Sequence, residues 1–220
     1  MMATNFPTSL DSLTNPAAGD SLSSPSHAAQ HSNVNDAVEA LQAKVGVDGS
    51  AVTGSLDYKV ANQGLTLVKS QNIIGPTASV TVTNAFSSTF DNYRITVNAD
   101  GSANGIGYEF QLGSATTGYY WTGTYLTLSS GPTRFVGNPA AAFNLGVTGA
   151  GHNSMAVSDV FWPYQGLRTS YINHSTGAAI YYTSAGYQQD FTSFTDFTIY
   201  IISPYVLNAG TIRVYGYNNG

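Results

Sequence analysis

The chain has 220 residues, of which 9% are charged, and its net charge is −5. An ordinary soluble domain has about 25% charged residues, so uncharged polar side chains must form most of this surface. Seven basic residues are too few for a patch that neutralises nucleic-acid phosphates, and no nucleic-acid partner is expected. The absence of cysteine excludes disulfides and thiolate metal sites.

The first residues do not predict targeting to a membrane. Met1–Leu10 has neither the basic region nor the apolar run of a secretory signal. The longest apolar stretches, such as Phe197–Ile202, are far shorter than the roughly 20 residues that span a bilayer. We therefore expect no membrane insertion.

Residues 1–31 are predicted to form an extended attachment arm. Three prolines recur every nine residues in this segment, and proline disfavours a helix at its own position and at the preceding one. The apolar side chains that could dock into grooves of a partner are Phe6, Leu10, Leu13 and Leu22. The alternative is a disordered tail, because the segment has too little apolar surface to form its own core.

Two histidines in this arm, His27 and His31, are four residues apart. On a helix they would share a face and could hold a metal ion, and in a trimer they could surround a threefold axis. Because no cysteine or carboxylate lies nearby as a further ligand, hydrogen bonding close to the start of a helix is favoured. No metal site is therefore predicted.

Residues 32–46 are predicted to form a short helix of the coiled-coil type. Ser32 or Asn33 can cap its start, and Gly46 is placed to end it. The apolar positions are spaced 4, 3 and 4 residues apart, as in a coiled-coil seam of about two heptads. These seam residues are Val34, Val38, Leu41 and Val45. Because two heptads are only marginally stable alone, the seam must gain stability from a neighbouring domain or from a partner, such as the other chains of a homotrimer. The alternative is one amphipathic helix packed on its own β-domain.

Residues 47–64 are predicted to form a linker, with room for one more helical turn at Leu56–Val60. From residue 65 the pattern changes to period two in runs such as SVTVT, YRITVN and YEFQL. Turn signals such as Gly75-Pro76 separate these runs. About ten strands without helices predict that residues 65–220 form an antiparallel, jelly-roll-like β-sandwich. The expected fold class is mainly β, with the sandwich preceded by the arm and one short helix.

Aromatic residues gather in the second region, where all but two of them follow residue 85. Two clusters stand out, GYYWTGTY (Gly118–Tyr125) and FWPY (Phe161–Tyr164). Exposed aromatic rings form stacking surfaces for sugars and protein partners, whereas buried rings form cores. The candidate receptor or partner contacts are Tyr119, Trp121, Tyr125, Trp162 and Tyr164. Packing in the core or between subunits is the alternative role of these clusters.

Residues that could carry catalysis form no recognisable motif. A pair of carboxylates such as Asp190 and Asp196 could serve a glycosidase if they shared a cleft. However, Asp91 and Asp100 stand in turn contexts, where carboxylates cap backbone groups. The chain has neither a nucleophile motif nor a dinucleotide fingerprint. We therefore expect a non-enzymatic protein with no catalytic residue and no cofactor.

Segments near both ends resemble virion structural proteins of tailed bacteriophages. TNFPTSLDSLTNP (Thr4–Pro16) and SPSHAAQHSNVNDAVEALQAKVGVDGSAV (Ser24–Val52) resemble the N-terminal module of minor structural, tail-fibre and head-fibre proteins. The C-terminal segment GTIRVYGYNNG (Gly210–Gly220) resembles phage structural domains more loosely. The resemblance implies a component of the virion and carries over no catalytic residue.

The sequence and this resemblance together predict an N-terminally anchored, trimeric short fibre or knob on the exterior of the phage particle. Its expected partners are other virion proteins of the capsid or tail, and a glycan or protein of the host surface. The alternative is a capsid decoration or cement protein whose arm lies across capsid subunits. A more remote alternative is a carbohydrate-active enzyme associated with the virion.

Overall fold

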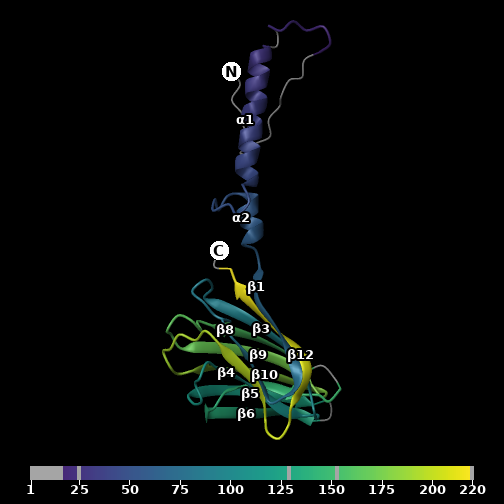
Figure 1. Cartoon of the computed structure of the whole chain (residues 1–220), viewed down its shortest axis with the longest axis vertical. Helices are drawn as coiled ribbons and strands as arrows, with labels where there is room; N and C mark the ends of the chain where they lie inside the picture. Colours follow the sequence, from purple (N-terminus) through teal and green to yellow (C-terminus); the bar gives the residue numbers. More distant parts are fainter. Residues whose placement is uncertain (1–16, 24–25, 128–129, 152–153, 219–220) are drawn as a thin grey trace. The chain divides into compact units, whose positions relative to one another are not determined.

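The computed structural model describes residues 17–23, 26–127, 130–151 and 154–218. The chain divides into two compact units, one that extends to Gln63 and one that comprises Gly64–Asn219. The helices belong to the first unit and the strands to the second (Figure 1). Among the residues described, no helix is both long and apolar enough to cross a membrane.

Helix α1 (His27–Val45) begins five residues before the predicted helix. Its N-cap is Ser26, whose hydroxyl oxygen accepts a hydrogen bond of 3.4 Å from the backbone N–H of Ala29. The prediction that Ser32 or Asn33 caps the helix is therefore wrong, and the last residues assigned to the arm are helical. The physical reason is that alanine and glutamine in the first turns favour a helix, and an extended serine is a good cap.

The predicted end of α1 is confirmed, because Gly46 is its C-cap with a φ of 89°. Glycine adopts this left-handed conformation without steric cost. The predicted linker 47–64 contains a second helix, α2 (Leu56–Ala61), so the first unit has one helix more than the predicted fold class. Ser55 caps α2 through its side-chain oxygen, which accepts a hydrogen bond of 3.2 Å from the backbone N–H of Tyr58.

The second unit has twelve strands within the described residues, where the sequence predicted about ten. They are β1 (Leu65–Thr77), β2 (Ser79–Val82), β3 (Asn92–Gly101), β4 (Ile106–Leu112), β5 (Tyr119–Thr127), β6 (Ser130–Ala140), β7 (Phe143–Thr148), β8 (Ser154–Phe161), β9 (Thr169–Gly177), β10 (Ile180–Gln188), β11 (Phe197–Ile201) and β12 (Leu207–Tyr217). All of the pairings between these strands are antiparallel.

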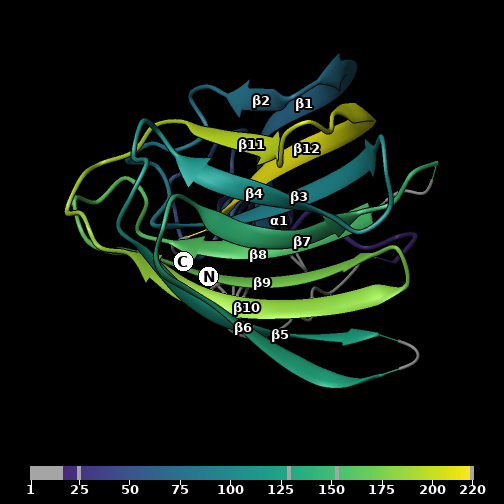
Figure 2. The same ribbon diagram turned by 90° about the horizontal axis from the view of Figure 1, so that it is seen from below.

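The strands form two sheets that pack face to face, and Figure 2 shows them as two layers. Over the described residues, the larger sheet has the order β1-β12-β3-β8-β9-β10-β5-β6, and the smaller has the order β2-β11-β4-β7. Without β5, β6, β9 and β10, the sheets reduce to β1-β12-β3-β8 facing β2-β11-β4-β7. That arrangement of eight strands is a jelly roll, so the predicted jelly-roll-like β-sandwich is confirmed.

The four additional strands form two hairpins, β5–β6 and β9–β10. Both hairpins extend the larger sheet beyond β8, so that its far half consists entirely of inserted strands. The two edge strands of this sheet, β1 and β6, both contain proline: Pro76 in β1, and Pro132 and Pro139 in β6. Proline lacks the backbone N–H that a further paired strand would require.

The hydrophobic core lies between the two sheets and is rich in aromatic rings. Phe143 of β7 is fully buried; its ring stacks on that of Tyr171 with 3.9 Å between centroids, and it meets the ring of Tyr119 edge-on at 4.8 Å. Along β3 and β8, inward-facing buried side chains alternate with outward-facing ones. Burial of this aromatic area stabilises the unit in a chain that has no disulfide.

Candidate binding surfaces

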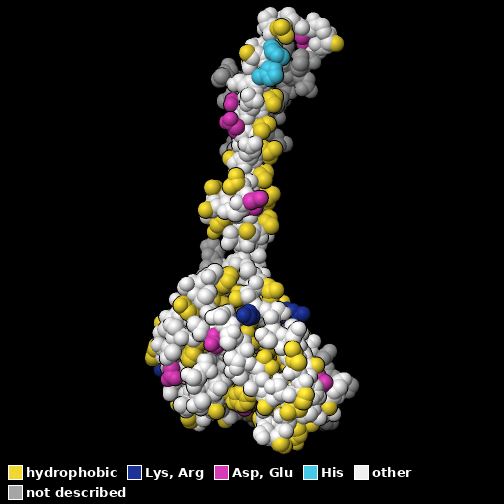
Figure 3. Space-filling model, in the orientation of Figure 1, with side chains coloured by type: hydrophobic (Ala, Val, Ile, Leu, Met, Phe, Trp, Pro, Cys, Tyr) yellow, Lys and Arg dark blue, Asp and Glu magenta, His cyan; other side chains and the backbone are white. Residues whose placement is uncertain are grey.

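The predicted seam forms an exposed apolar stripe along α1. The exposed fractions of its side chains are 49% for Val34, 46% for Val38, 51% for Leu41 and 45% for Val45. Figure 3 shows hydrophobic side chains on the surface of this helix. Because burial of apolar surface is favourable, this stripe is a candidate surface for helix–helix association.

Three of the four predicted docking residues of the arm, Phe6, Leu10 and Leu13, lie outside the described residues. Leu22 is described and is 78% exposed. Its backbone carbonyl accepts a hydrogen bond of 3.0 Å from the N–H of His27, the first residue of α1. The chain therefore turns at Leu22 immediately before the helix and presents this side chain to solvent.

The first aromatic cluster lies mostly on the inner face of β5, so its role as an exposed contact surface is not supported. Tyr119 is fully buried, and its hydroxyl accepts a hydrogen bond from the N–H of Leu112 (2.8 Å) and donates one to the carbonyl of Ala115 (3.0 Å). The expectation that Tyr119 contacts a receptor is wrong. The alternative role, packing in the core, is confirmed for Tyr119, because its face of the strand is turned toward the core.

Trp121 and Tyr125 share that inner face and are partly buried. Trp121 packs against the core and donates a hydrogen bond of 2.8 Å from Nε1 to the carbonyl of Ala142. Tyr125 contacts the rings of Phe135 and Tyr182, which also meet each other edge-on at 5.6 Å. These rings pack together beneath the inserted strands, so they support the extension of the larger sheet.

The second cluster divides between the core and the surface. Tyr164 is partly buried and packs against the core, whereas the indole of Trp162 is 43% exposed. The backbone of Trp162 has a φ of 57°, which is unusual for a bulky residue and indicates a conformation imposed by its surroundings. Trp162 therefore remains a candidate contact residue, and Tyr164 is chiefly a packing residue.

A different set of aromatic rings forms an exposed patch, which we call the outer aromatic patch: Tyr120, Arg168, Tyr187 and Phe191. Tyr120 and Tyr187 are cross-strand partners on β5 and β10, and their rings stack with 5.3 Å between centroids. The guanidinium of Arg168 lies 5.3 Å from the ring centre of Tyr187 and 5.6 Å from that of Phe191. Phe191 is 67% exposed. Such a platform can stack on the apolar face of a sugar or on a protein side chain.

The sequence did not predict the outer aromatic patch. Its members come from β5, β10 and two loops, which are far apart in the chain. The only local signal was the period-two alternation along β10, which places Tyr181, Thr183 and Tyr187 on the same face of that strand. No feature of the sequence indicated that β10 pairs with β5.

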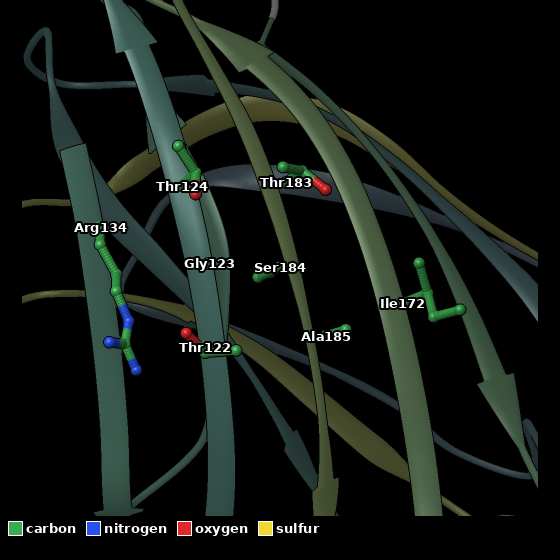
Figure 4. Close-up of a pocket in the computed structure, with 8 residues that line it drawn as sticks. All are labelled: Thr122, Gly123, Thr124, Arg134, Ile172, Thr183, Ser184 and Ala185. Carbon is green, nitrogen blue, oxygen red and sulfur yellow. The ribbon is translucent and has the colours of Figure 1, made fainter. Parts of the chain in front are cut away.

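An open depression of about 420 Å³ lies on the same outer face of the larger sheet. Figure 4 shows that its lining comes from the adjacent strands β9, β10, β5 and β6. The lining residues are Thr122, Gly123, Thr124, Arg134, Ile172, Thr183, Ser184 and Ala185. Hydroxyl groups and one guanidinium can bind a polar ligand, but the depression contains no carboxylate or histidine that could transfer a proton.

The carboxylates of the second unit are all used in hydrogen bonds that hold the fold together. Asp190 accepts a bond of 2.7 Å from the side chain of Gln188, and Asp196 one of 2.8 Å from the N–H of Asn84. The remaining carboxylates accept bonds from Gln165 (to Asp91), Gly151 (to Asp100), Tyr200 (to Glu109) and Arg94 (to Asp159). These bonds close turns or join strands, which is a structural use of acidic residues.

One ion pair lies on the outer face of the larger sheet within the described residues. Arg94 donates two hydrogen bonds to Asp159, of 2.7 and 2.8 Å, and the hydroxyl of Tyr217 donates one of 2.6 Å. Burial alone would raise the pKa of Asp159, but the hydrogen bonds from Arg94 and Tyr217 outweigh it and lower that pKa. Burial, together with the bond to Asp159, raises the pKa of Tyr217 to about 12.

Comparisons of the chain with protein-family models, curated proteins and solved structures give no match. The features of the described residues that bear on function are the exposed stripe of α1 and the outer face of the sandwich.

Proposed function

We propose that this chain is a non-enzymatic structural protein on the exterior of a tailed-bacteriophage particle. In this proposal the chain forms a homotrimer through α1, the N-terminal segment attaches it to other virion proteins, and the sandwich forms a short fibre or knob. The outer aromatic patch is the surface that we assign to contact with a glycan or protein of the host.

The single observation that carries the proposal is the exposed stripe on α1. Its four apolar side chains are each about half exposed, and their spacing is that of a coiled coil. Val34 and Val38 are both β-branched and occupy consecutive seam positions, a combination that favours trimers. Leu41 followed by Val45 is instead the combination found in dimers. The molar mass of the assembled protein distinguishes these two stoichiometries.

The character of the sandwich supports a structural role. Its carboxylates hold turns and strands together, and its surface contains few charges that would have to be desolvated in a permanent assembly. The resemblance of Thr4–Pro16 and Ser24–Val52 to the N-terminal module of virion proteins supports attachment through that end.

The test is the double substitution Val38→Asp and Leu41→Asp, made both in purified protein and in the phage genome. Two buried carboxylates in each chain would be costly in a helical seam, so we expect light scattering to show a complete change from trimer to monomer. We also expect the variant to be lost from purified particles, because a single arm binds more weakly than three linked arms.

The matched control is Asn35→Asp with Ala43→Asp, which adds the same charge at exposed positions of α1 outside the stripe. This control should remain trimeric and should be incorporated normally. Labelling of the wild-type protein in images of the virion then gives its position, on the tail for a fibre and on the capsid for a decoration protein. Absence of the protein from purified particles would overturn the proposal.

A further inference from the structure

The two histidines at the start of α1 continue the apolar stripe. His27 and His31 precede Val34 by seven and three residues, so the spacing 4, 3, 4, 3, 4 extends without interruption from His27 to Val45. Both imidazoles are exposed, as are the four apolar side chains. A parallel association through the stripe would therefore bring the histidines of all copies together at its N-terminal end.

The two imidazoles already point toward each other within one chain. The Nε2 atoms of His27 and His31 lie 3.0 Å apart, and the rings meet edge-on with 4.4 Å between centroids. At this distance the two nitrogens can share a hydrogen bond, and the tautomers of the rings decide which one donates.

The same distance suits a divalent transition metal. Nitrogen ligands at about 2.1 Å from a metal lie about 3.0 Å apart when they occupy adjacent corners of an octahedron. Within the described part of a single chain, no group of three or more histidine, cysteine or acidic side chains could hold a metal. One chain thus supplies two nitrogens at the spacing of adjacent ligands, and further copies of the chain can supply the rest of the shell.

We propose that His27 and His31 of three copies form a divalent transition-metal site on the axis of the helical seam. Six imidazoles match an octahedral ion such as nickel or iron, and imidazole also binds zinc, which usually takes four ligands. The metal fastens the N-terminal end of a seam whose apolar part is only about two heptads long. This inference rests on the proposed trimer.

The experiment uses full-length protein without a histidine tag, stripped of metal with EDTA. Its molar mass is measured by light scattering before and after addition of Ni²⁺ or Zn²⁺, and calorimetry gives the stoichiometry. We expect one metal ion per three chains and a rise in the melting temperature, because a ligand that binds only the assembled state stabilises it. The variant His27→Gln with His31→Gln should lose at least tenfold in metal affinity.

The matched control is His174→Gln, which removes an exposed imidazole from β9 and should leave metal binding unchanged. If the protein is trimeric in EDTA but binds no metal, or if the double variant binds it as tightly as wild type, the site is wrong and the seam stands. If the protein is monomeric with and without metal, the seam is wrong, and the metal site with it.

Discussion

The two units of this chain treat their hydrophobic residues in opposite ways. The sandwich has a core of fully buried large side chains, among them Phe143 and Phe197, while α1 leaves Val38 and Leu41 about half exposed. A unit that buries its own apolar surface is stable alone, whereas a short helix with an exposed stripe gains stability only from a partner. In the trimer that we propose, the sandwich supplies the stable fold and the helical unit supplies the contacts between copies.

The largest effect is expected when the two units are separated. A fragment of residues 64–220 should remain soluble, give a β-type circular dichroism spectrum and be fully monomeric, because the seam is absent. The two tryptophans, Trp121 and Trp162, belong to the sandwich, so their fluorescence follows its unfolding in both proteins. An aggregating fragment would show that the helical unit completes the core, and the comparison would fail.

A substitution in the core should lower the free energy of unfolding of the sandwich by several kcal/mol, whereas one on the stripe should not. Phe143→Ala removes a fully buried ring that contacts Tyr119 and Tyr171, and such truncations cost about 3–5 kcal/mol. Leu41→Ala, on the exposed stripe, should change the unfolding free energy of the sandwich by less than about 0.5 kcal/mol. Tryptophan fluorescence in a urea titration measures both, and equal losses would contradict the division of roles.

A smaller effect is expected in alkaline solution, where the free energy of unfolding of the sandwich should fall. In the folded state the pKa of Tyr217 is about 12, compared with about 10 for an unperturbed tyrosine. Below pH 10 its contribution to stability is fully present. Between pH 10 and 12 the unfolded state loses its proton first, so the free energy of unfolding falls as the pH rises.

The measurement for this effect is urea unfolding at pH 8 and pH 11.5. Tyr217→Phe should reduce the alkaline loss, whereas Tyr205→Phe, which removes a hydroxyl at an exposed position, serves as the control. Burial also raises the pKa of the core tyrosines Tyr108 and Tyr171, so part of the loss should persist in every variant. Identical losses in wild type and Tyr217→Phe would refute the role of Tyr217.

Local patterns predicted much of this fold. The alternation along YRITVN identified β3, Gly46 was recognised as the end of α1, and the scarcity of aromatic residues before residue 85 located the core. The start of α1 was predicted too late, because the prolines of the arm outweighed the helix-forming residues around His27. Ser26 was the local signal for the true cap.

Non-local features could not be predicted from the sequence. Two faces of β5 carry aromatic residues, and only the pairing of β5 with β10 and β6 decides which face is inside. For that reason the sequence left open whether Tyr119 lies on the surface or in the core, and it did not predict the stack of Tyr120 on Tyr187. The insertion of two hairpins into a jelly roll likewise depends on strand order, which period-two patterns do not encode.

The prolines in β1 and β6 have a consequence for how two copies of the sandwich can meet. A sheet with an unblocked edge can recruit another chain and grow without limit, as aggregates and fibrils do. Pro76 on one edge and Pro132 and Pro139 on the other remove backbone donors from both sides of the larger sheet. Neighbouring sandwiches can thus lie side by side and remain separate molecules, because neither edge of the larger sheet offers a complete row of backbone donors to another chain.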